Sequence, residues 1–139
     1  MTERERVVLY CDGGARGNPG PAAIGAVVLD PHTDPPTQLA TVSERIGVTT
    51  NNVAEYRSLI AGLEAARQFP APAITVKADS QLVVRQLQGR YRVKQAHLRP
   101  LYEKARALLA RYEEVELVHV PRERNVVADA LVNAALDGA

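Results

Sequence analysis

Hydrophobic positions in the first third of the chain come in short runs separated by turn residues, a pattern typical of strands. We predict strands at "RVVLYCDGG", "AAIGAVVLD" and "QLATVSERI", and their short connections favour an antiparallel meander. The apolar run over residues 7–10 is nearly continuous. We therefore expect the first strand to be buried on both faces and to stop at Asp12-Gly13-Gly14.

From Thr49 the hydrophobic period changes to three and four, which predicts a helix running to about Phe69-Pro70. The later pattern predicts a strand at "AITVKADS", helices at "SQLVVRQLQG" and "HLRPLYEKARALLARY", a strand at "VELVHV" and a last helix at "NVVADALVNAAL". The expected order of elements is therefore βββαβααβα.

Strand–helix–strand connections require parallel neighbours with right-handed crossovers. The strands at 6–12, 73–79 and 115–120 should then lie side by side, with the meander extending the sheet on the other edge. This predicts a mixed α/β fold with a five-stranded sheet in the order 3-2-1-4-5. The 139 residues suit one domain over 1–139, structured over about 5–136.

Composition narrows the class of protein. A net charge of +1 gives no global basic signal, so a polyanionic partner must be sought in local patches. A single cysteine excludes an intramolecular disulfide and a cysteine-based zinc site. The N-terminal "MTERERVVLY" lacks the apolar core of a secretory signal, and no apolar segment could span a bilayer. We expect a cytoplasmic protein.

The stretch "YCDGGARGNPGPAAIGAVVL" raises three alternatives: a phosphate loop, a hairpin turn or a metal site. A phosphate loop requires G-x-G-x-x-G or G-K-[ST] at the start of a helix. Neither pattern is present, and the residues that follow favour a strand. A hairpin with Asp12 as a turn residue and a metal site at Asp12 both stay open.

Four carboxylates are expected at one edge of the sheet. Asp12 and Asp79 each close an apolar strand, and parallel neighbours bring both to the carboxyl edge. We place Glu55 in the first turn of the first long helix and Asp129 on the last helix, within reach of that edge.

Each acid also has an ordinary structural explanation. Asp79 could cap the helix that follows it, Glu55 could complete a capping box with Asn52, and Asp129 could be a solvated helix residue. Taken together these explanations weaken, because Asp129 lies in the otherwise apolar "VVADALVNAAL", where an unpaired acid is costly to bury.

Convergent carboxylates suit a hard cation. The chain has three scattered histidines, His32, His97 and His119, of which we interpret His97 and His119 as surface or satisfied residues. Oxygen ligands without cysteine favour Mg²⁺ or Mn²⁺ over zinc. Two such ions are the arrangement used for phosphodiester cleavage, so the indicated chemistry is phosphoryl transfer to water.

Four segments, "YCDGGARGNPGPAAIGAVV", "TTNNVAEYRSLIAGLEAA", "KADSQLVVRQL" and "RERNVVADALVNAA", together resemble the motif blocks of type 1 ribonuclease H. The resemblance implies the ribonuclease H fold and hydrolysis of the RNA strand of RNA–DNA hybrids, giving 5′-phosphate and 3′-hydroxyl ends. It also implies Asp12, Glu55, Asp79 and Asp129 as catalytic ligands of two Mg²⁺ ions, with Mn²⁺ as a substitute.

The resemblance extends to substrate contacts in the minor groove or at a phosphate. The matching positions are Asn18, Thr50, Asn51, Asn52 and Gln81. Short amide and hydroxyl side chains suit this role because they can contact 2′-hydroxyls across a wide, shallow groove. Helix capping by Thr50 or Asn52 is the alternative.

The chain departs from many ribonuclease H sequences at two places. The loop "VPRERN" has no histidine, so Arg122 or Arg124 would contact phosphate there without shuttling protons. The basic handle of some relatives is replaced by "GRYRVKQAHLR", which is either a DNA-phosphate contact or a solvated connector. Its basic residues are Arg90, Arg92, Lys94 and Arg99, with Tyr91 available for stacking.

Three functional hypotheses follow. The leading one is a Mg²⁺-dependent endoribonuclease acting on RNA–DNA hybrids. A second adds double-stranded RNA as a substrate, and a third is a hybrid-binding module that has lost the chemistry. We expect a monomer with no membrane partner. Because some relatives carry a C-terminal phosphatase-like domain, the chain could be the N-terminal domain of a longer protein.

Overall fold

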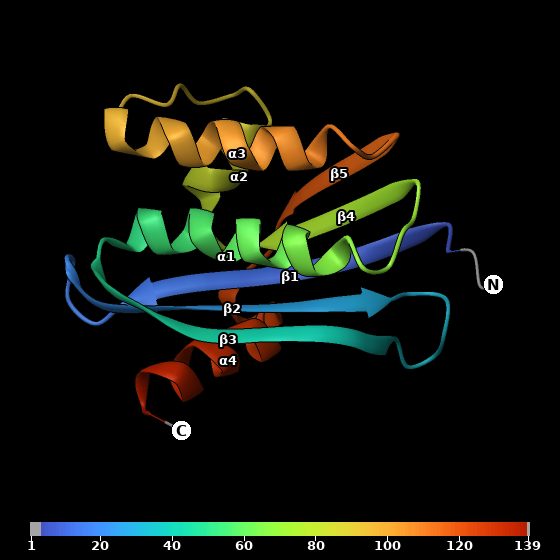
Figure 1. The fold of residues 1–139 in the computed structure, drawn as a ribbon, viewed down its shortest axis with the longest axis horizontal. Coiled ribbons are helices and arrows are strands. Elements are labelled where there is room, and N and C mark those ends of the chain that lie inside the picture. Colours follow the sequence, from blue (N-terminus) through green and yellow to red (C-terminus); the bar gives the residue numbers. More distant parts are fainter. Residues whose placement is uncertain (1–3, 139) are drawn as a thin grey trace.

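The computed structural model describes residues 4–138, which form a five-stranded mixed sheet with helices on both faces (Figure 1). The strand order is β3-β2-β1-β4-β5, which confirms the expected 3-2-1-4-5. The strands are β1 (Arg6–Ala15), β2 (Gly20–Asp30), β3 (Thr37–Thr49), β4 (Ala73–Ala78) and β5 (Glu114–His119). The helices are α1 (Asn51–Ala66), α2 (Gln81–Leu87), α3 (Arg99–Leu109) and α4 (Val126–Leu136), with 3₁₀ turns η1 (Ala96–Leu98) and η2 (Arg122–Arg124).

The parallel pairing of β1, β4 and β5 ends at one level of the sheet. β1 pairs with β4 from Arg6↔Ala73 to Cys11↔Ala78, and β4 pairs with β5 as far as Ala78↔His119. Asp12 and Asp79 therefore follow directly after the last paired residues of neighbouring strands. This register brings both carboxylates to the same edge of the sheet, as the sequence predicts.

The helices divide between the two faces of the sheet. Helices α1, α2 and α3 cover one face and α4 covers the other (Figure 1). The main core lies on the first face, where Leu9 and Val76 of the sheet pack with Leu59 and Leu63 of α1. A smaller cluster of Ala23, Val132 and Ala135 holds α4 on the second face.

Several expected details of the elements are wrong. β1 is not buried on both faces, since Val8 and Tyr10 are half-buried; α4, with 11 residues, covers only part of the second face. Nor does β1 stop at Asp12-Gly13-Gly14, because antiparallel pairing with β2 carries it on to Ala15. Helix α1 ends at Ala66, before Phe69, and the segment expected as one helix from His97 begins as the 3₁₀ turn η1.

Within residues 4–138, no helix combines the length and the apolar character needed to cross a bilayer.

Candidate active site

Three acids from distant parts of the chain meet where the parallel pairing of β1 with β4 ends: Asp12 lies within β1, Asp79 directly follows β4, and Glu55 lies on α1. Each of Asp12, Glu55 and Asp79 offers a carboxylate oxygen, and these oxygens lie within 4.8 Å of one another. They line a cavity of about 530 Å³, and Asp12 is only 7% exposed. The convergence expected from the sequence is thus present for these three carboxylates.

Glu55 reaches Asp12 because α1 lies directly against β1. A Cβ at Gly13 would overlap the carbonyl oxygen of Ala54, so only glycine permits this approach. The Gly13 N–H donates to Glu55 Oε1 at 2.6 Å and fixes the carboxylate beside the strand.

The expected place of Glu55 in the helix is wrong. Helix α1 begins at Asn51, and its first turn contains no acidic residue, so Glu55 opens the second turn. The capping-box alternative also fails, because the N-cap is Thr50, whose side chain accepts a hydrogen bond from Val53 N at 3.3 Å. Glu55 is therefore free of a capping role and faces the cavity.

Asp79 is likewise not the cap of the helix that follows it. Ser80 caps α2 by accepting from Val83 N, which leaves the Asp79 carboxylate to the cavity. His119, at the end of β5, is exposed and places Nε2 3.3 Å from the Asp79 carbonyl oxygen. It is thus a surface residue, as expected, but it lies at the edge of the acidic site.

Asp129 lines the same cavity but lies outside the three-acid cluster. Its carboxylate accepts from Arg122 at 3.3 Å and from Asn133 Nδ2 at 3.4 Å. Helix α4 comes this close to the sheet at Gly25, where a Cβ would overlap the carbonyl oxygen of Ala128. The packing of α4 against the sheet therefore brings Asp129 to the cavity, where Arg122 donates a hydrogen bond to its carboxylate.

Asn125 is a site residue that sequence reasoning did not single out. It is 1% exposed, and its Nδ2 donates to the Cys11 carbonyl oxygen at 2.9 Å, one residue before Asp12. Its own carbonyl oxygen accepts from Asp129 N at 3.0 Å. Asn125 thereby joins the two chain segments that carry these acids. The available signal was a lone amide between the arginine-rich turn and an apolar helix.

The electrostatics of the cluster favour a bound cation. Burial, followed by the charge of Asp79, raises the pKa of Asp12 to about 7. Burial and the neighbouring Asp12 raise the pKa of Glu55 well above its ordinary value. Carboxylates crowded in this way resist ionisation unless a positive charge joins them. The donor set fits a hard divalent cation held by oxygen ligands.

A second group of polar residues forms at the turn between β1 and β2. Asn51 Oδ1 accepts from Ala15 N at 2.8 Å, and Asn18 Oδ1 accepts from Asn51 N at 3.1 Å. The Thr50 hydroxyl oxygen accepts a hydrogen bond from Val53 N, so the alternative of helix capping holds for Thr50 and not for Asn52. With their oxygens engaged internally, the side chains of Asn18 and Asn51 have their NH₂ donors left for a ligand.

Comparison with known proteins places this geometry in a family. A family model described as reverse transcriptase-like matches residues 10–135. The N-terminal RNase H domain of Rv2228c from Mycobacterium tuberculosis is 49% identical, with a TM-score of 0.90 over 95% of this chain and 99% of that chain. The chain belongs to the type 1 ribonuclease H family.

Two further solved structures are similar to this ribonuclease H chain. RNase H1 of Halobacterium salinarum is 46% identical, with a TM-score of 0.90 over 96% of this chain and 99% of that one. LC11-RNase H1, solved in complex with RNA/DNA hybrid, is 43% identical, with a TM-score of 0.86 over 94% and 96%. The chain spans 36% of the length of the curated Rv2228c protein and 66% of the curated Halobacterium ribonuclease HI.

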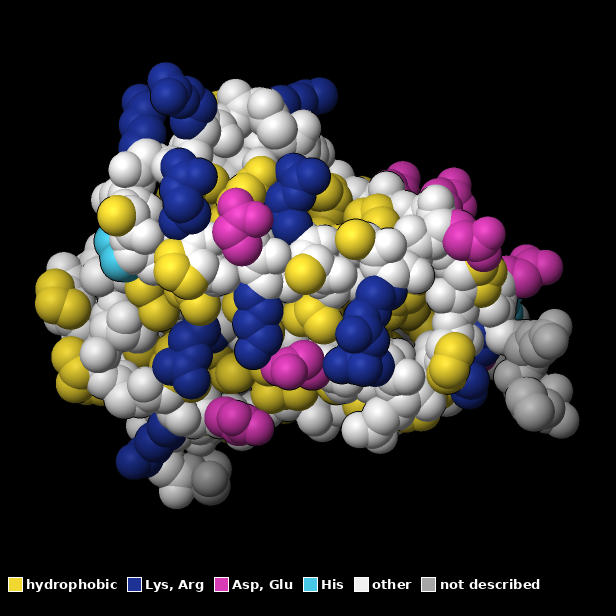
Figure 2. Space-filling view, turned by 45° about the horizontal axis from the view of Figure 1, so that its top comes forward, with side chains coloured by type: hydrophobic (Ala, Val, Ile, Leu, Met, Phe, Trp, Pro, Cys, Tyr) yellow, Lys and Arg dark blue, Asp and Glu magenta, His cyan; other side chains and the backbone are white. Residues whose placement is uncertain are grey.

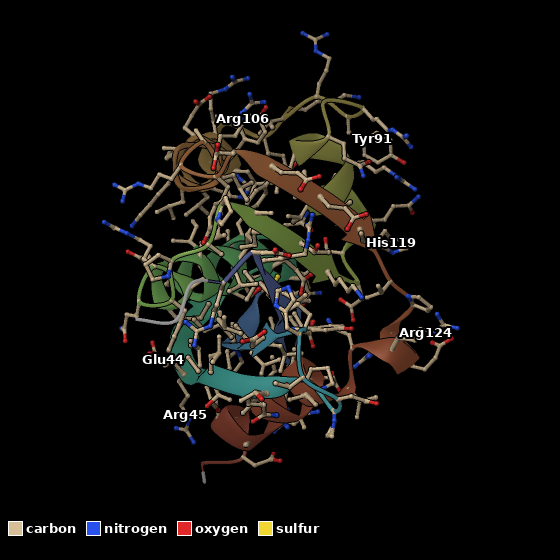
Figure 3. The ribbon with its side chains drawn as sticks, turned by 90° about the vertical axis from the view of Figure 1, so that its right-hand side faces the viewer. Glu44, Arg45, Tyr91, Arg106, His119 and Arg124 are labelled. Atoms are coloured by element: carbon tan, nitrogen blue, oxygen red, sulfur yellow. The ribbon has the colours of Figure 1, made fainter. Side chains whose placement is uncertain are left out.

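The two arginines of the η2 turn in this ribonuclease H chain face different surroundings. Arg122 lines the acidic cavity, whereas Arg124 lines a separate hollow with Tyr10 and Val127. In Figure 3, Arg124 projects outward from the turn between β5 and α4. Of these two residues, the structure brings only Arg122 to the acids.

The basic connector of this ribonuclease H chain borders a second hollow of about 450 Å³. Val93 is 9% exposed and anchors the connector in the core, while Tyr91 is 44% exposed. Asn52 lines both this hollow and the acidic cavity, so it lies between the two. Tyr91 and His119 lie on the same side of the molecule in Figure 3.

Charged side chains over the helical face are mixed. Figure 2 shows lysine and arginine side chains interspersed with acidic ones over the face that α1 and α3 form. A face of mixed sign does not provide the basic stripe that a nucleic acid backbone requires.

Proposed function

We propose that this domain is a divalent-metal-dependent endoribonuclease that hydrolyses the RNA strand of RNA–DNA hybrids, leaving 5′-phosphate and 3′-hydroxyl ends. The observation that carries the proposal is the cluster of Asp12, Glu55 and Asp79, whose carboxylate oxygens lie within 4.8 Å of one another. The complex of LC11-RNase H1 with RNA/DNA hybrid supports the substrate class. The chain spans only part of the length of its curated relatives, so the activity is proposed for this domain and, as part of the same proposal, for a longer protein that contains it.

The cations are proposed to be two Mg²⁺ ions, with Mn²⁺ as a substitute, held by Asp12, Glu55, Asp79 and Asp129. Bound there, they would supply Lewis-acid stabilisation of the phosphoryl group and activation of the attacking water. Burial raises the pKa values of Asp12 and Glu55, which favours their protonated forms in the absence of metal. Since a carboxylate must be deprotonated to bind a cation, metal binding would release protons from these two residues. Asp129, paired with Arg122 and outside the cluster, completes the set from α4.

The substrate is proposed to approach over the turn between β1 and β2. Asn18 and Asn51 present NH₂ donors, since their oxygens already accept backbone N–H groups. The minor groove of a hybrid offers acceptors, namely base N3 and O2 atoms and the RNA 2′-hydroxyls. An NH₂ donor opposite a 2′-hydroxyl provides a contact that distinguishes RNA from DNA.

The remaining substrate contacts are proposed from position alone. Thr50 keeps its hydroxyl hydrogen as a donor, Asn52 lies between the two hollows, and Gln81 is exposed at the start of α2. Arg122 is proposed to contact a phosphate beside the acids, and Arg124 a phosphate further along the strand.

Cleavage of double-stranded RNA is a second candidate activity. The observation that favours it is the group of donors at Asn18 and Asn51, since an RNA duplex presents the same 2′-hydroxyl acceptors. A hybrid-binding module without catalysis is disfavoured, because it would not need three clustered carboxylates. The monomeric state, the cytoplasmic location and a fused phosphatase-like domain stay predictions.

Matched duplexes test the proposal. RNA–DNA, RNA–RNA and DNA–DNA duplexes of one sequence are incubated with the domain in Mg²⁺, in Mn²⁺ and in EDTA. We expect cleavage of the RNA strand of the hybrid, absent in EDTA and abolished by Asp12→Asn or Asp79→Asn. Glu123→Gln removes an exposed acid outside the cavity and should cleave normally. Hybrid cleavage that survives both aspartate variants would contradict the assignment, and an intact RNA duplex in Mn²⁺ would remove the second candidate.

Calorimetric titration with Mg²⁺ distinguishes the contributions of Asp12 and Asp129 to metal binding. Asp12→Asn should abolish binding because Asp12 belongs to the three-acid cluster. Asp129→Asn should keep binding of one ion, because Asp129 lies outside that cluster. Equal loss in both variants would show that all four acids form one inseparable site.

A further inference from the structure

Arg16 lies in the turn between β1 and β2, at the rim of the acidic cavity. Its guanidinium Nη2 is 2.7 Å from Asp137 Oδ1, at the C-terminal end of α4. The two side chains are 51% and 60% exposed. Arg16 is thus one of the positively charged residues that line the acidic cavity, and its guanidinium is paired with the exposed carboxylate of Asp137.

The turn does not depend on this ion pair for its shape. Its backbone is closed by Arg16 N donating to Pro21 O at 2.8 Å, and Ala15 N is held by Asn51 Oδ1. An exposed ion pair contributes about 0–1 kcal/mol to stability. The guanidinium can therefore exchange its partner at little cost to the fold.

Two arginines bracket the cavity from opposite ends of α4. Among the described residues that line it, Arg16 and Arg122 are the cations. Arg122 pairs with Asp129 in the first turn of α4, and Arg16 pairs with Asp137 at its end. Eight residues of helix separate the two carboxylates, or about 12 Å at 1.5 Å per residue, so the arginines are placed to meet different phosphates of one strand.

We propose that Arg16 binds a backbone phosphate of the RNA strand, and that Asp137 holds the guanidinium in position until that phosphate replaces it. The inference rests on the proposed function and extends it to a residue that the sequence analysis did not assign to substrate binding. A phosphate offers the same pair of anionic oxygens as a carboxylate, and the planar fork of arginine matches both. The carboxylate therefore keeps the side chain in the conformation that the substrate needs.

The competing explanation is that the ion pair only fastens the turn to α4. Variants of the two partners, Arg16 and Asp137, distinguish the two explanations. If the pair is a fastener, Arg16→Ala and Asp137→Asn remove the same contact and should weaken substrate binding equally. If Asp137 competes with the phosphate, Arg16→Ala weakens binding while Asp137→Asn leaves it unchanged or tightens it.

Binding is measured by fluorescence anisotropy with RNA–DNA hybrid and Mg²⁺ in the Asp79→Asn background, across a salt series. We expect Arg16→Ala to raise Kd about five- to tenfold and to reduce the salt slope by about one. Arg16→Lys should fall between, because it keeps the charge and loses the fork. Asp137→Asn should give a Kd no higher than that of the parent. Arg111→Ala, an exposed arginine beyond α3 and outside the cavity, controls for net charge.

The contact is then located with hybrids that carry one neutral methylphosphonate linkage at a time. The parent should lose affinity at one linkage of the RNA strand that Arg16→Ala no longer senses. Unchanged binding in Arg16→Ala, equal weakening in Asp137→Asn, or a sensitive linkage on the DNA strand overturns the inference. Wild-type protein that binds but does not cleave would overturn the proposed function instead, leaving the Arg16 result intact.

Discussion

Asn125 donates its side-chain amide to the carbonyl oxygen of Cys11 at 2.9 Å, across 114 positions of sequence. This single buried hydrogen bond ties the start of α4, which carries Asp129, to the strand that carries Asp12. The chain segments that carry Asp12 and Asp129 are thus connected by a residue whose side chain hydrogen-bonds to the backbone of one of them.

Asn125→Ala should lower the free energy of unfolding by about 2 kcal/mol, because it leaves a buried carbonyl oxygen without its donor. We also expect a lower kcat with little change in KM, since Asp129 would lose its position while the substrate contacts stay. Urea unfolding and steady-state cleavage measure the two effects. Asn133→Ala, exposed on the same helix, should change stability by no more than about 0.5 kcal/mol. Equal stability losses in both variants would refute the buried-bond explanation.

Gly13→Ala should be far more damaging than Gly14→Ala. A Cβ at Gly13 meets the Ala54 backbone, whereas the nearest atom to a Cβ at Gly14 is Val132 Cγ1 at 3.9 Å. Overpacking of this kind costs about 1–3 kcal/mol, and here it also pushes α1 and Glu55 away from Asp12. Thermal unfolding and Mg²⁺ titration of both variants check the difference, and the expectation is wrong if Gly14→Ala is the worse of the two.

The metal-free protein should lose stability as the pH rises from about 4 to about 7, because the pKa of Asp12 is raised to about 7 in the folded state and lies near 3.9 when unfolded. Across that interval the folded state binds more protons than the unfolded state, so the free energy of unfolding falls. Glu55, whose pKa is also raised, contributes with the same sign.

Asp12→Asn removes the Asp12 part of this dependence. In EDTA at about pH 8 the free energy of unfolding of the variant should exceed that of the wild type by about 4 kcal/mol, and the difference should shrink toward about pH 4. Adding Mg²⁺ at the higher pH should stabilise the wild type and not the variant. Urea unfolding at both pH values, with Glu123→Gln as control, measures this; a pH-independent wild type would speak against the raised pKa.

Asn51→Asp tests the donor arrangement at the substrate turn. The variant keeps an oxygen for Ala15 N and replaces the exposed NH₂ donor with a negatively charged acceptor. We expect stability within about 1 kcal/mol of wild type and a KM for hybrid raised about tenfold. Gln68→Glu adds the same charge at an exposed position after the end of α1 and should leave KM unchanged. If Asn51→Asp also leaves KM unchanged, Asn51 does not contact the substrate.

The sequence by itself determined the sheet and the edge at which Asp12 and Asp79 meet. Apolar runs specify strands, and right-handed crossovers specify their parallel order, so the positions of two acids followed from local pattern and chain topology. The helix pattern placed Glu55 and Asp129 within reach of that edge, and the family resemblance assigned all four acids as metal ligands.

Only the tertiary structure decided how the acids are held. Glu55 turns to the cavity because Thr50 takes the cap and Gly13 admits the helix, and Asp129 stays outside the three-acid cluster. The Asn125 bond to Cys11 and the Arg16 pair with Asp137 join segments more than one hundred residues apart. Hydrophobic periodicity indicates which face of a helix or strand is buried. It does not indicate the partner of a polar atom, because packing of distant segments decides which groups come within hydrogen-bonding distance.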